Sequence, residues 1–518
     1  MALPWWRRGA IYQIYPRSFA DSDGDGIGDL AGVTAHLDHL EALGVEAVWL
    51  SPFYRSPMKD FGYDVADYLD VDPIFGTLAD FDTLVEQAHA RGIRVIVDVV
   101  PNHSSDQHPW FTESRASRDN PKRDWYVWRD GRGEDGREPP NAWRSAFPAV
   151  QRAWSYDDAT RQWWLHSFLP EQPDLNWDNP EVEAAMHDVL RFWLDRGVDG
   201  FRIDVTQKLA KDPQLRDDVP GEPARSEDWR PAIHERLRRL RAVADAYEGE
   251  RVLIGEVYLL DLERVVAYVN SGDELHLAHN FVFLKLDWDA AAFRASIDRW
   301  DELASANAWP AWFLSNHDHP RVASRFDDPA GLGPQRARAV LLMLYALRAT
   351  PFVFQGEELG LPDAEIPPDR IVDVDGRDPE RAPIPWAPPS TAGPGAGFTT
   401  GDPWLPITSQ AERLNVAAQD ADPASTLHLT RALARLRAAE PALQDGAQRT
   451  FDAGPDVLAW TRGDAFVALV NFAAQERTAT LPGDGEIALS TDPARDPAGA
   501  VRGEVALAPG EGLLIRLG

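Results

Sequence analysis

The feature that most constrains this chain is an alternation of short apolar runs with longer helical patterns. Several runs are almost continuously apolar and rich in β-branched residues, as parallel strands covered on both faces are. Between them, apolar residues recur at helical spacing, as in residues 78–90 and in residues 180–196, which follow a potential capping residue, Asn179. The eight strand candidates are residues 10–15, 45–50, 93–100, 198–205, 252–258, 278–283, 311–318 and 351–355. Eight strands that alternate with helices predict an α/β chain folded as a (β/α)8 TIM barrel.

Two segments interrupt this alternation. Residues 102–173 are rich in Trp, Pro and Asp, and their length of about 70 residues far exceeds an ordinary βα loop. We predict that they form an inserted domain B after strand 3. Residues 444–518 contain short alternating runs separated by Gly and Pro turns, which predicts a C-terminal antiparallel β-sheet domain. The catalytic barrel is then expected to comprise residues 1–101 and 174–443.

Composition narrows the class of protein. The 518 residues include 52 Lys and Arg and 83 Asp and Glu, a formal net charge of −31. This balance argues against nucleic acid or an anionic membrane as a partner and favours a neutral or cationic small substrate. The chain has no Cys, which excludes disulfides and thiolate chemistry. No run approaches the roughly 18 apolar residues of a membrane span, and charge comes too early for a signal peptide. We therefore expect a cytoplasmic enzyme.

Ionisable residues stand where the third, fourth, fifth and seventh strand candidates end. In a barrel of this kind the active site forms at those ends. Any one of these residues is compatible with a solvated strand end or a structural ion pair. Together they predict a site rich in carboxylates. The residues are Asp98 with His103, Arg202 with Asp204, Glu256, and His317 with Asp318.

The sequence around these residues resembles the α-amylase family of glycoside hydrolases (family 13), over essentially the whole chain. Four blocks occur in order: DVVPNH (98–103), GFRIDV (200–205), GEVY (255–258) and LSNHD (314–318). QPDLNW (172–177) and GRDPERAPIPW (376–386) further resemble the oligo-1,6-glucosidase/α-glucosidase branch. The resemblance implies a retaining, exo-acting α-glucosidase. Such an enzyme hydrolyses terminal α-linked glucose from short α-glucosides by double displacement and transfers glucose at high substrate concentration.

The resemblance assigns catalysis to three carboxylates. Retaining enzymes need one carboxylate to attack the anomeric carbon and another to protonate the leaving oxygen. By resemblance, Asp204 is the nucleophile, Glu256 is the general acid/base, and Asp318 holds the 2- and 3-hydroxyls of the sugar. Arg202 lies two positions before Asp204 on the strand, so both side chains face the same way. A fixed cation there favours the ionised carboxylate that a nucleophile needs.

The resemblance also implies a tight pocket for one terminal glucose. Asp60 would bind ring hydroxyls, Tyr63 would form an aromatic platform, and Arg377 would pair with Asp60 to close the end of the pocket. His103 would donate to the 6-hydroxyl region and His317 to the 2- and 3-hydroxyl region. The inserted domain would contribute to the pocket wall Phe147, Phe168 and Gln172, with ordinary hydrophobic packing as the alternative for the two Phe residues.

A second signal is the acidic loop at residues 21–29, DSDGDGIGD. Alternating carboxylates and glycines let oxygen ligands curl around a hard cation. The twelfth position counted from Asp21 is Gly32, which excludes an EF-hand. By resemblance, the loop binds a structural Ca²⁺ or Mg²⁺ through the side chains of Asp21, Asp23, Asp25 and Asp29 and the carbonyl of Ile27.

Several alternatives stay open. A sucrose- or trehalose-acting hydrolase and a glucosyltransferase of the same family would share every site residue named above. The candidate substrates are therefore maltose, isomaltose, sucrose, trehalose and short oligosaccharides. The closed pocket disfavours an endo-amylase, and the three carboxylates disfavour a catalytically dead scaffold. Val205 accompanies α-1,6 or broad activity in this branch, but Thr206 and residues 207–211 depart from the oligo-1,6 pattern.

Overall fold

The computed structural model describes residues 3–495 and 499–518, and its central element is a sheet of eight parallel strands. Their order is β11-β10-β9-β5-β2-β1-β13-β12. A parallel bridge between His279 and Ala311 joins the two ends of this order, so the sheet closes into a barrel. Each of the eight predicted runs overlaps one strand, which confirms the TIM-barrel prediction. The strands are β1 (Ile11–Ile14), β2 (Ala47–Leu50), β5 (Arg94–Val99), β9 (Gly200–Ile203), β10 (Val252–Gly255), β11 (Leu277–Ala278), β12 (Ala311–Trp312) and β13 (Thr350–Phe354).

Most strands are shorter than the predicted runs, and the largest differences are at 278–283 and 311–318, where each strand has two residues. The run at 278–283 leaves the sheet after Ala278, because the side chain of Asn280 accepts a hydrogen bond from the amide of Phe283 and starts helix α9 (Phe281–Leu284). An Asn at this position is a common helix N-cap. The run at 311–318 is a strand only as far as Trp312, beyond which the chain turns and Asn316 Oδ1 accepts from the amide of Asp318.

Each barrel strand is followed by a helix that packs outside the sheet. Sequence signals fix several ends: Thr77 and Asp80 form a capping box before α4, and Asn179 caps α6. The long helices are α3 (Leu37–Leu43), α4 (Leu78–Ala90), α6 (Pro180–Asp195), α7 (Ala232–Asp245), α8 (Leu262–Asn270), α10 (Ala290–Leu303), α12 (Gly333–Ala346) and α16 (Thr426–Ala439). Shorter ones are α1 (Trp5–Arg8), α2 (Leu30–Ala35), α11 (Val322–Arg325), α13 (Asp378–Arg381), α14 (Pro389–Ala392), α15 (Val416–Asp420) and α17 (Pro441–Asp445).

The interior of the barrel changes from apolar to charged along the strands. Because side chains alternate across a strand, Ile96 and Asp98 face the same way, as do Ile254 and Glu256 two residues apart. The apolar end is filled by one buried cluster that includes Trp5, Trp6, Ile11, Trp49, Ile96, Ile254, Leu277, Phe313 and Phe352. The charged end is the carboxyl end of the strands, so the sequence pattern itself places the polar groups there.

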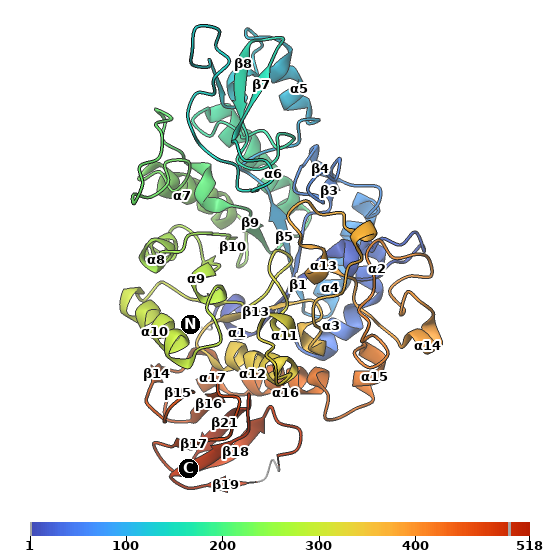
Figure 1. Cartoon of the computed structure of the whole chain (residues 1–518), viewed down its shortest axis with the longest axis vertical. Helices are drawn as coiled ribbons and strands as arrows, with labels where there is room; N and C mark the ends of the chain where they lie inside the picture. Colours follow the sequence, from blue (N-terminus) through green and yellow to red (C-terminus); the bar gives the residue numbers. More distant parts are fainter. Residues whose placement is uncertain (1–2, 496–498) are drawn as a thin grey trace.

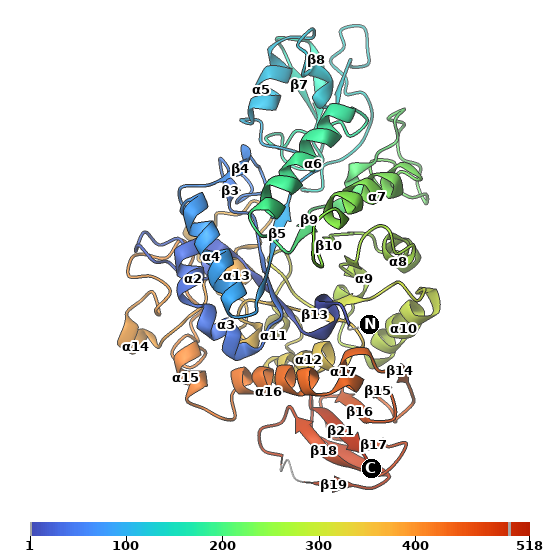
Figure 2. The ribbon, with the colours of Figure 1, turned by 180° about the vertical axis from the view of Figure 1, so that it is seen from behind.

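Two additions extend the barrel at opposite ends of the molecule (Figures 1 and 2). The segment after β5 contains α5 (Pro109–Ala116) and a small sheet with the order β6-β8-β7, formed by β6 (Trp128–Arg129), β7 (Trp154–Asp157) and β8 (Gln162–Leu165). A hairpin of β3 (Tyr54–Arg55) and β4 (Asp67–Val71) follows β2. The exact domain boundaries stay predictions.

The C-terminal sheet is antiparallel, as predicted, and has the order β14-β15-β16-β21-β18-β19, with β17 and β20 paired separately. Within the described residues, no helix combines the length and the apolar character needed to cross a membrane. The strands are β14 (Gln448–Thr450), β15 (Val457–Arg462), β16 (Phe466–Asn471), β17 (Arg477–Thr480), β18 (Gly485–Ser490), β19 (Ala500–Val501), β20 (Glu504–Leu507) and β21 (Gly512–Leu517).

Candidate active site

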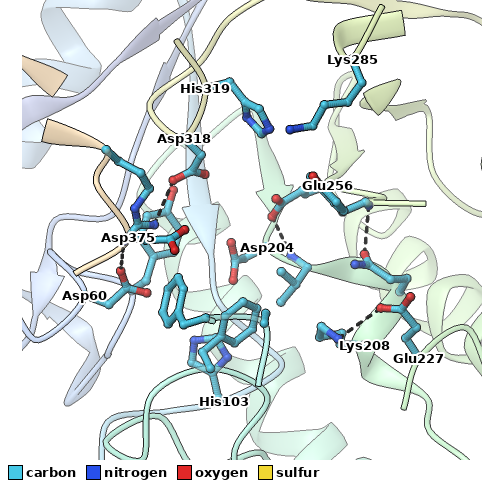
Figure 3. A pocket seen from close by; sticks show the side chains of 18 residues that line it. Asp60, His103, Asp204, Lys208, Glu227, Glu256, Lys285, Asp318, His319 and Asp375 are labelled. Atoms are coloured by element: carbon cyan, nitrogen blue, oxygen red, sulfur yellow. Dashed lines mark hydrogen bonds and ion pairs between the residues drawn. The ribbon is translucent and has the colours of Figure 1, made fainter. Parts of the chain in front are cut away.

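A cavity of about 470 Å³ opens at the carboxyl ends of the barrel strands (Figure 3). Most of the predicted catalytic and substrate-binding residues line it: Asp60, Tyr63, His103, Phe147, Phe168, Asp204, Glu256, Asp318 and Arg377. The other three lie directly behind this wall and bond to lining residues. They are Gln172, Arg202 and His317. The structure therefore brings together all twelve residues that were predicted for catalysis and substrate binding.

Three buried carboxylates share one guanidinium at the base of the cavity. Arg202 Nη1 lies 2.8 Å from Asp204 Oδ1 and 2.9 Å from Asp98 Oδ1, and Nη2 lies 2.7 Å from Glu256 Oε2. The guanidinium also lies over the ring of Trp49, 5.1 Å from its centroid. These groups come from β2, β5, β9 and β10, neighbouring strands whose ends must meet at this edge of the barrel.

Charge in this cluster is unbalanced. Burial and the neighbouring Glu256 carboxylate raise the pKa of Asp204 well above its usual value, although Arg202 acts in the opposite direction. Burial likewise raises the pKa of Asp98 to about 7. The guanidinium of Arg202 favours the ionised form of Asp204, but it is divided among three carboxylates, so burial and the Glu256 carboxylate still raise the pKa of Asp204.

The backbone conformation of the residue after Asp204 allows its amide to bond to Glu256. Val205 has φ 36° and ψ 48°, a left-handed conformation that is a genuine outlier for a β-branched residue. In this conformation the Val205 amide donates to Glu256 Oε2 at 2.9 Å. Such strain persists only where surrounding contacts impose it, and it clusters at functional sites.

Asp318 lies in a different environment from Asp204. Its Oδ1 accepts from Arg381 Nη2 at 2.8 Å and from Arg377 Nη1 at 3.1 Å, and Oδ2 lies 3.2 Å from His317 Nε2. Burial opposes ionisation of this carboxyl, but the His317 ring and the two guanidiniums outweigh it and hold the pKa of Asp318 well below its usual range. Asp318 is therefore an ionised hydrogen-bond acceptor in the cavity.

One end of the cavity is closed by an ion pair. Arg377 Nη2 lies 2.8 Å from Asp60 Oδ1, and Gln172 Nε2 donates to Asp60 Oδ2 at 2.9 Å. Asp373 holds Arg377 in place through Nε at 3.0 Å and Nη2 at 2.7 Å. The guanidinium also lies over the ring of Phe147, 5.2 Å from its centroid, so this Phe contacts the site and does not merely pack in the inserted segment.

The aromatic and imidazole groups are fixed by one another. The Tyr63 ring stacks on His317 with centroids 5.4 Å apart, and its hydroxyl lies 2.7 Å from His317 Nε2. Gln13 Nε2 contacts His317 Nδ1 at 2.7 Å. On the other side of the cavity, the ring of Phe168 lies 5.2 Å from His103 and 5.6 Å from Phe147.

Several functional side chains escaped the sequence prediction. Arg381 and Asp373 hold Asp318 and Arg377, and the available signal was their spacing of four residues from Arg377 on either side. Asp98 was predicted as a strand-end carboxylate of the site but was given no role. The wall on the Glu256 side was also missed, because it comes from loops without a recognisable pattern. It includes Gln207, Lys208, Glu227, Tyr258 and Lys285. Two lining residues elsewhere in the cavity were missed as well, Asp375 beside Asp60 and His319 beside Asp318 (Figure 3).

The acidic loop at 21–29 lies outside this cavity. Carboxylate oxygens of Asp21, Asp23 and Asp29 lie within 4.8 Å of one another, and Asp25 is not part of that group in the described residues. Asp29 also caps α2 by accepting from the amide of Gly32 at 2.6 Å. Burial and the charges of neighbouring Asp residues raise the pKa of Asp25, although its bond from the amide of Ile27 opposes this shift.

Comparison with known proteins gives consistent matches over nearly the whole chain. The family model of the α-amylase catalytic domain matches residues 13–446. A probable α-glucosidase of Rhizobium meliloti is 42% identical over 510 residues, covering 92% of this chain and 91% of that protein. An oligo-1,6-glucosidase of Parageobacillus thermoglucosidasius is 36% identical over 535 residues, covering 93% of each. The solved structure of an α-glucosyl transfer enzyme, XgtA, is 39% identical, covers 100% of both chains and superposes with a TM-score of 0.91.

Proposed function

Because the chain belongs to the α-amylase family of glycoside hydrolases, we propose that it is a retaining, exo-acting α-glucosidase that acts on short α-glucosides. One observation carries this proposal. The carboxylates of Asp204 and Glu256 are held on the two terminal nitrogens of a single guanidinium, at the base of a cavity closed by the Asp60–Arg377 pair.

In the proposed reaction, Asp204 attacks the anomeric carbon while Glu256 donates a proton to the glycosidic oxygen, and the leaving group departs. Glu256, now ionised, takes a proton from a water molecule, and the water oxygen attacks the anomeric carbon of the glucosyl–Asp204 ester. Glucose is released, Asp204 is again a carboxylate, and Glu256 is again protonated. Retaining enzymes need their carboxyls roughly 5–5.5 Å apart, and inverting ones roughly 6.5–9.5 Å. Sharing one planar guanidinium supports the shorter separation.

Asp318 is suited to hold two adjacent sugar hydroxyls. It is an ionised acceptor, so its hydrogen bonds strengthen as positive charge develops on the sugar in the oxocarbenium-like transition state. Arg377 and Arg381 fix both its charge and its position. These contacts support a contribution from Asp318 to binding of the transition state.

The closed end supports exo action. We expect the Asp60–Arg377 pair, which contacts Gln172 and Phe147, to block the space for a sugar beyond the first. The opposite side is lined by Lys285 and Glu227 (Figure 3) and by Tyr258, and we expect the leaving group to bind there. Maltose, isomaltose, sucrose, trehalose and short oligosaccharides all fit this scheme, and the cytoplasmic location expected from the sequence stays a prediction.

Glucosyl transfer is the second candidate, because a full-length structural neighbour at 39% identity is an α-glucosyl transfer enzyme. Transfer uses the same glucosyl–Asp204 ester and differs only in the acceptor, a sugar hydroxyl in place of water. The ratio of transfer to hydrolysis, measured from the products at rising substrate concentration, separates the two activities.

We also propose that the loop at 21–29 binds a structural Ca²⁺ or Mg²⁺. The donor set consists of oxygens, as both ions prefer, and carboxylates of Asp21, Asp23 and Asp29 converge. The charges of Asp21, Asp23 and Asp29 also help to raise the pKa of Asp25, and a bound cation would relieve this repulsion. The loop lies outside the cavity, so the ion would supply stability and no chemistry.

The configuration of the first product tests the proposed mechanism. Early hydrolysis of an α-glucoside, followed by proton NMR, should show the α-anomer of glucose before mutarotation produces the β-anomer. An initial β signal would contradict both the double displacement and the assignment of Asp204 as nucleophile.

A further inference from the structure

A second cavity, of about 290 Å³, lies in the inserted segment and shares no lining residue with the active-site cavity. Within the part of the chain that the structure describes, its wall holds three arginines and no acidic side chain. This contrasts with the chain as a whole, which has 83 acidic residues against 52 basic ones. The three arginines are Arg132, Arg144 and Arg152, and the buried residues of the wall are Asn141, Trp143 and Trp154.

The buried part of this wall is held by hydrogen bonds that leave it little freedom. Asn141 Oδ1 accepts from the amide of Trp143 at 3.0 Å and from Trp154 Nε1 at 2.7 Å, and its Nδ2 donates to the carbonyl of Leu215 at 2.9 Å. Trp143 Nε1 donates to the carbonyl of Arg216 at 3.0 Å. Both Trp rings belong to the apolar cluster of the inserted segment. The wall is therefore formed before any ligand binds.

Arg144 and Arg152 come to the cavity from the two arms of one loop. The amide of Ala153 donates to the carbonyl of Trp143 at 3.1 Å and so ties the arms together. Arg144 and Arg152 are the next residues inward on each arm, and two like charges placed opposite each other repel. Among the described residues, neither guanidinium has an ion-pair or hydrogen-bond partner. An anion between them would remove this repulsion.

The third arginine is partly balanced. Arg132 Nε donates to the carbonyl of Pro139 at 2.9 Å, and its Nη1 lies 3.7 Å from Asp217 Oδ2, a carboxylate that also accepts from the amide of Ala142 at 2.6 Å. One carboxylate near three guanidiniums leaves the cavity positive. The net charge of −31 on the whole chain opposes this only weakly, because salt screens charges that lie more than about 8–10 Å apart.

We propose that this cavity binds the phosphoryl group of a small ligand between Arg144 and Arg152. The planar guanidinium fork matches phosphate oxygens and can bind two of them at once. A phosphate monoester carries a charge of about −1.5 to −2 at pH 7, which balances the two guanidiniums that have no partner. The site lies on the loop whose Ala146 and Phe147 line the active-site cavity, but it does not depend on the proposed function.

Calorimetric titration with three probes tests the chemistry of the ligand. Inorganic phosphate and glycerol 3-phosphate should both bind to the wild type, whereas glycerol, which has no phosphoryl group, should not. A tighter Kd for glycerol 3-phosphate would identify a phosphate ester as the ligand, and an equal or weaker one would identify free phosphate. Absence of binding by both phosphates, or binding of glycerol as tight as theirs, would overturn the proposal.

A double variant tests the place of binding. Arg144→Met with Arg152→Met removes both guanidiniums that have no partner, and Kd for inorganic phosphate should rise at least about tenfold, because hydrogen bonds to charged groups are lost. Arg435→Met with Arg449→Met is the matched control, since it changes the net charge equally at exposed positions of α16 and β14. The control should keep the wild-type Kd. The same Kd in all three proteins would contradict the proposal.

A second measurement needs no variant and therefore does not depend on how a variant folds. Phenylglyoxal modifies accessible arginines of the wild type, and mass spectrometry of the peptides locates the modified residues. Saturating phosphate should protect Arg144 and Arg152 and leave Arg435 and Arg449 reactive. Equal modification of Arg144 and Arg152 with and without phosphate would overturn the proposal. A wild type that binds phosphate in this way but cleaves no α-glucoside would refute the proposed function and leave this site established.

Discussion

At Arg202, one buried positive charge faces the three buried carboxylates of Asp98, Asp204 and Glu256. A single cation cannot balance three anions in a medium of low dielectric, so burial and the repulsion between the anions oppose ionisation of the cluster. The pKa of Asp98 is accordingly raised to about 7, and that of Asp204 is raised well above its usual value.

Replacing Glu256 separates the two chemical steps. Glu256→Gln should lose much more activity on natural disaccharides than on aryl glucosides with good leaving groups, because an aryloxide departs without much protonation. Added azide should restore turnover of the aryl glucoside by attacking the glucosyl–Asp204 ester without base assistance, giving α-glucosyl azide, because the second displacement inverts the β-linked ester.

Asp204→Asn is the matched comparison, since it is nearly isosteric and removes the nucleophile itself. It should be inactive on both substrate types, without rescue by azide and with an unchanged far-ultraviolet circular dichroism spectrum. Equal losses on both substrates in Glu256→Gln, together with no azide product, would show that Glu256 is not the acid/base.

At the scale of elements, the barrel was predictable because period-two alternation and helical spacing are local properties of the sequence. The same alternation places Asp98 beyond Ile96 and Glu256 beyond Ile254, so these carboxylates could be assigned to strand ends. The predicted strand at 278–283 was wrong after Ala278, because the Asn280 cap outweighs the strand preference of the apolar residues that follow it.

The missed site residues depend on contacts between segments far apart in the chain. Arg381 reaches Asp318 across 63 positions, and Arg377 reaches Asp60 across 317. No local pattern encodes which loop folds over the cavity. Arg377 was predicted by resemblance, because it lies in a family motif. Arg381, four residues later at the end of α13, was not predicted, because a spacing of four residues is equally typical of ordinary helix packing.

The acidic loop at 21–29 predicts a dependence of stability on divalent cations. A cation bound only by the folded chain stabilises it by about 2.7 kcal/mol at a hundredfold excess over Kd. EDTA should therefore lower the melting temperature, and Ca²⁺ or Mg²⁺ should restore it, with little direct effect on kcat at 25 °C. An unchanged melting temperature together with no metal in elemental analysis would identify the loop as a turn only.

Glu357, which follows β13, predicts how stability depends on pH. It accepts from Ser315 Oγ at 2.6 Å and from the amide of Phe354 at 2.8 Å, and burial raises its pKa from 4.5 to about 7. Between these two values the folded chain holds a proton that the unfolded chain has lost. Stability contributed by this group is therefore present below pH 4.5 and falls as the pH rises toward 7.

Glu357→Gln removes this titration while keeping the shape of the side chain. The melting temperature of the variant should decline less between pH 5 and pH 7 than that of the wild type. Parallel curves for the two proteins in this range would show that Glu357 does not carry a raised pKa.

At the scale of the whole molecule, α12 lies between the barrel and the C-terminal sheet (Figures 1 and 2). Its carboxyl end is capped by two buried arginines that come from outside the helix. Arg462 of β15 donates to the carbonyl of Ala346 at 2.7 Å, and Arg437 of α16 donates to that of Tyr345 at 2.7 Å. Cations are favoured at this end of a helix, where carbonyls lack partners within the helix.

Arg462→Met should loosen the attachment of the C-terminal sheet. The change removes the hydrogen bonds from Arg462 to the carbonyls of Ala346, Gly446 and Gln444, and a hydrogen bond contributes about 0.5–1.5 kcal/mol. The midpoint of urea unfolding should therefore fall while kcat at 25 °C stays the same. Arg449→Met, at an exposed position of the neighbouring strand β14, is the control and should change neither. An unaltered midpoint for Arg462→Met would show that the sheet is held by its apolar contacts alone.

The ion pair between Asp60 and Arg377 has a consequence for how such an enzyme would treat a polymer. A cavity with a closed end accepts only the terminal sugar of a chain. At the same molar concentration, a long chain therefore offers no more cleavable bonds than a short one. Digestion would shorten each chain by single steps from one terminus. A starch solution would accordingly keep its viscosity, and its blue colour with iodine, long after free sugar had begun to accumulate.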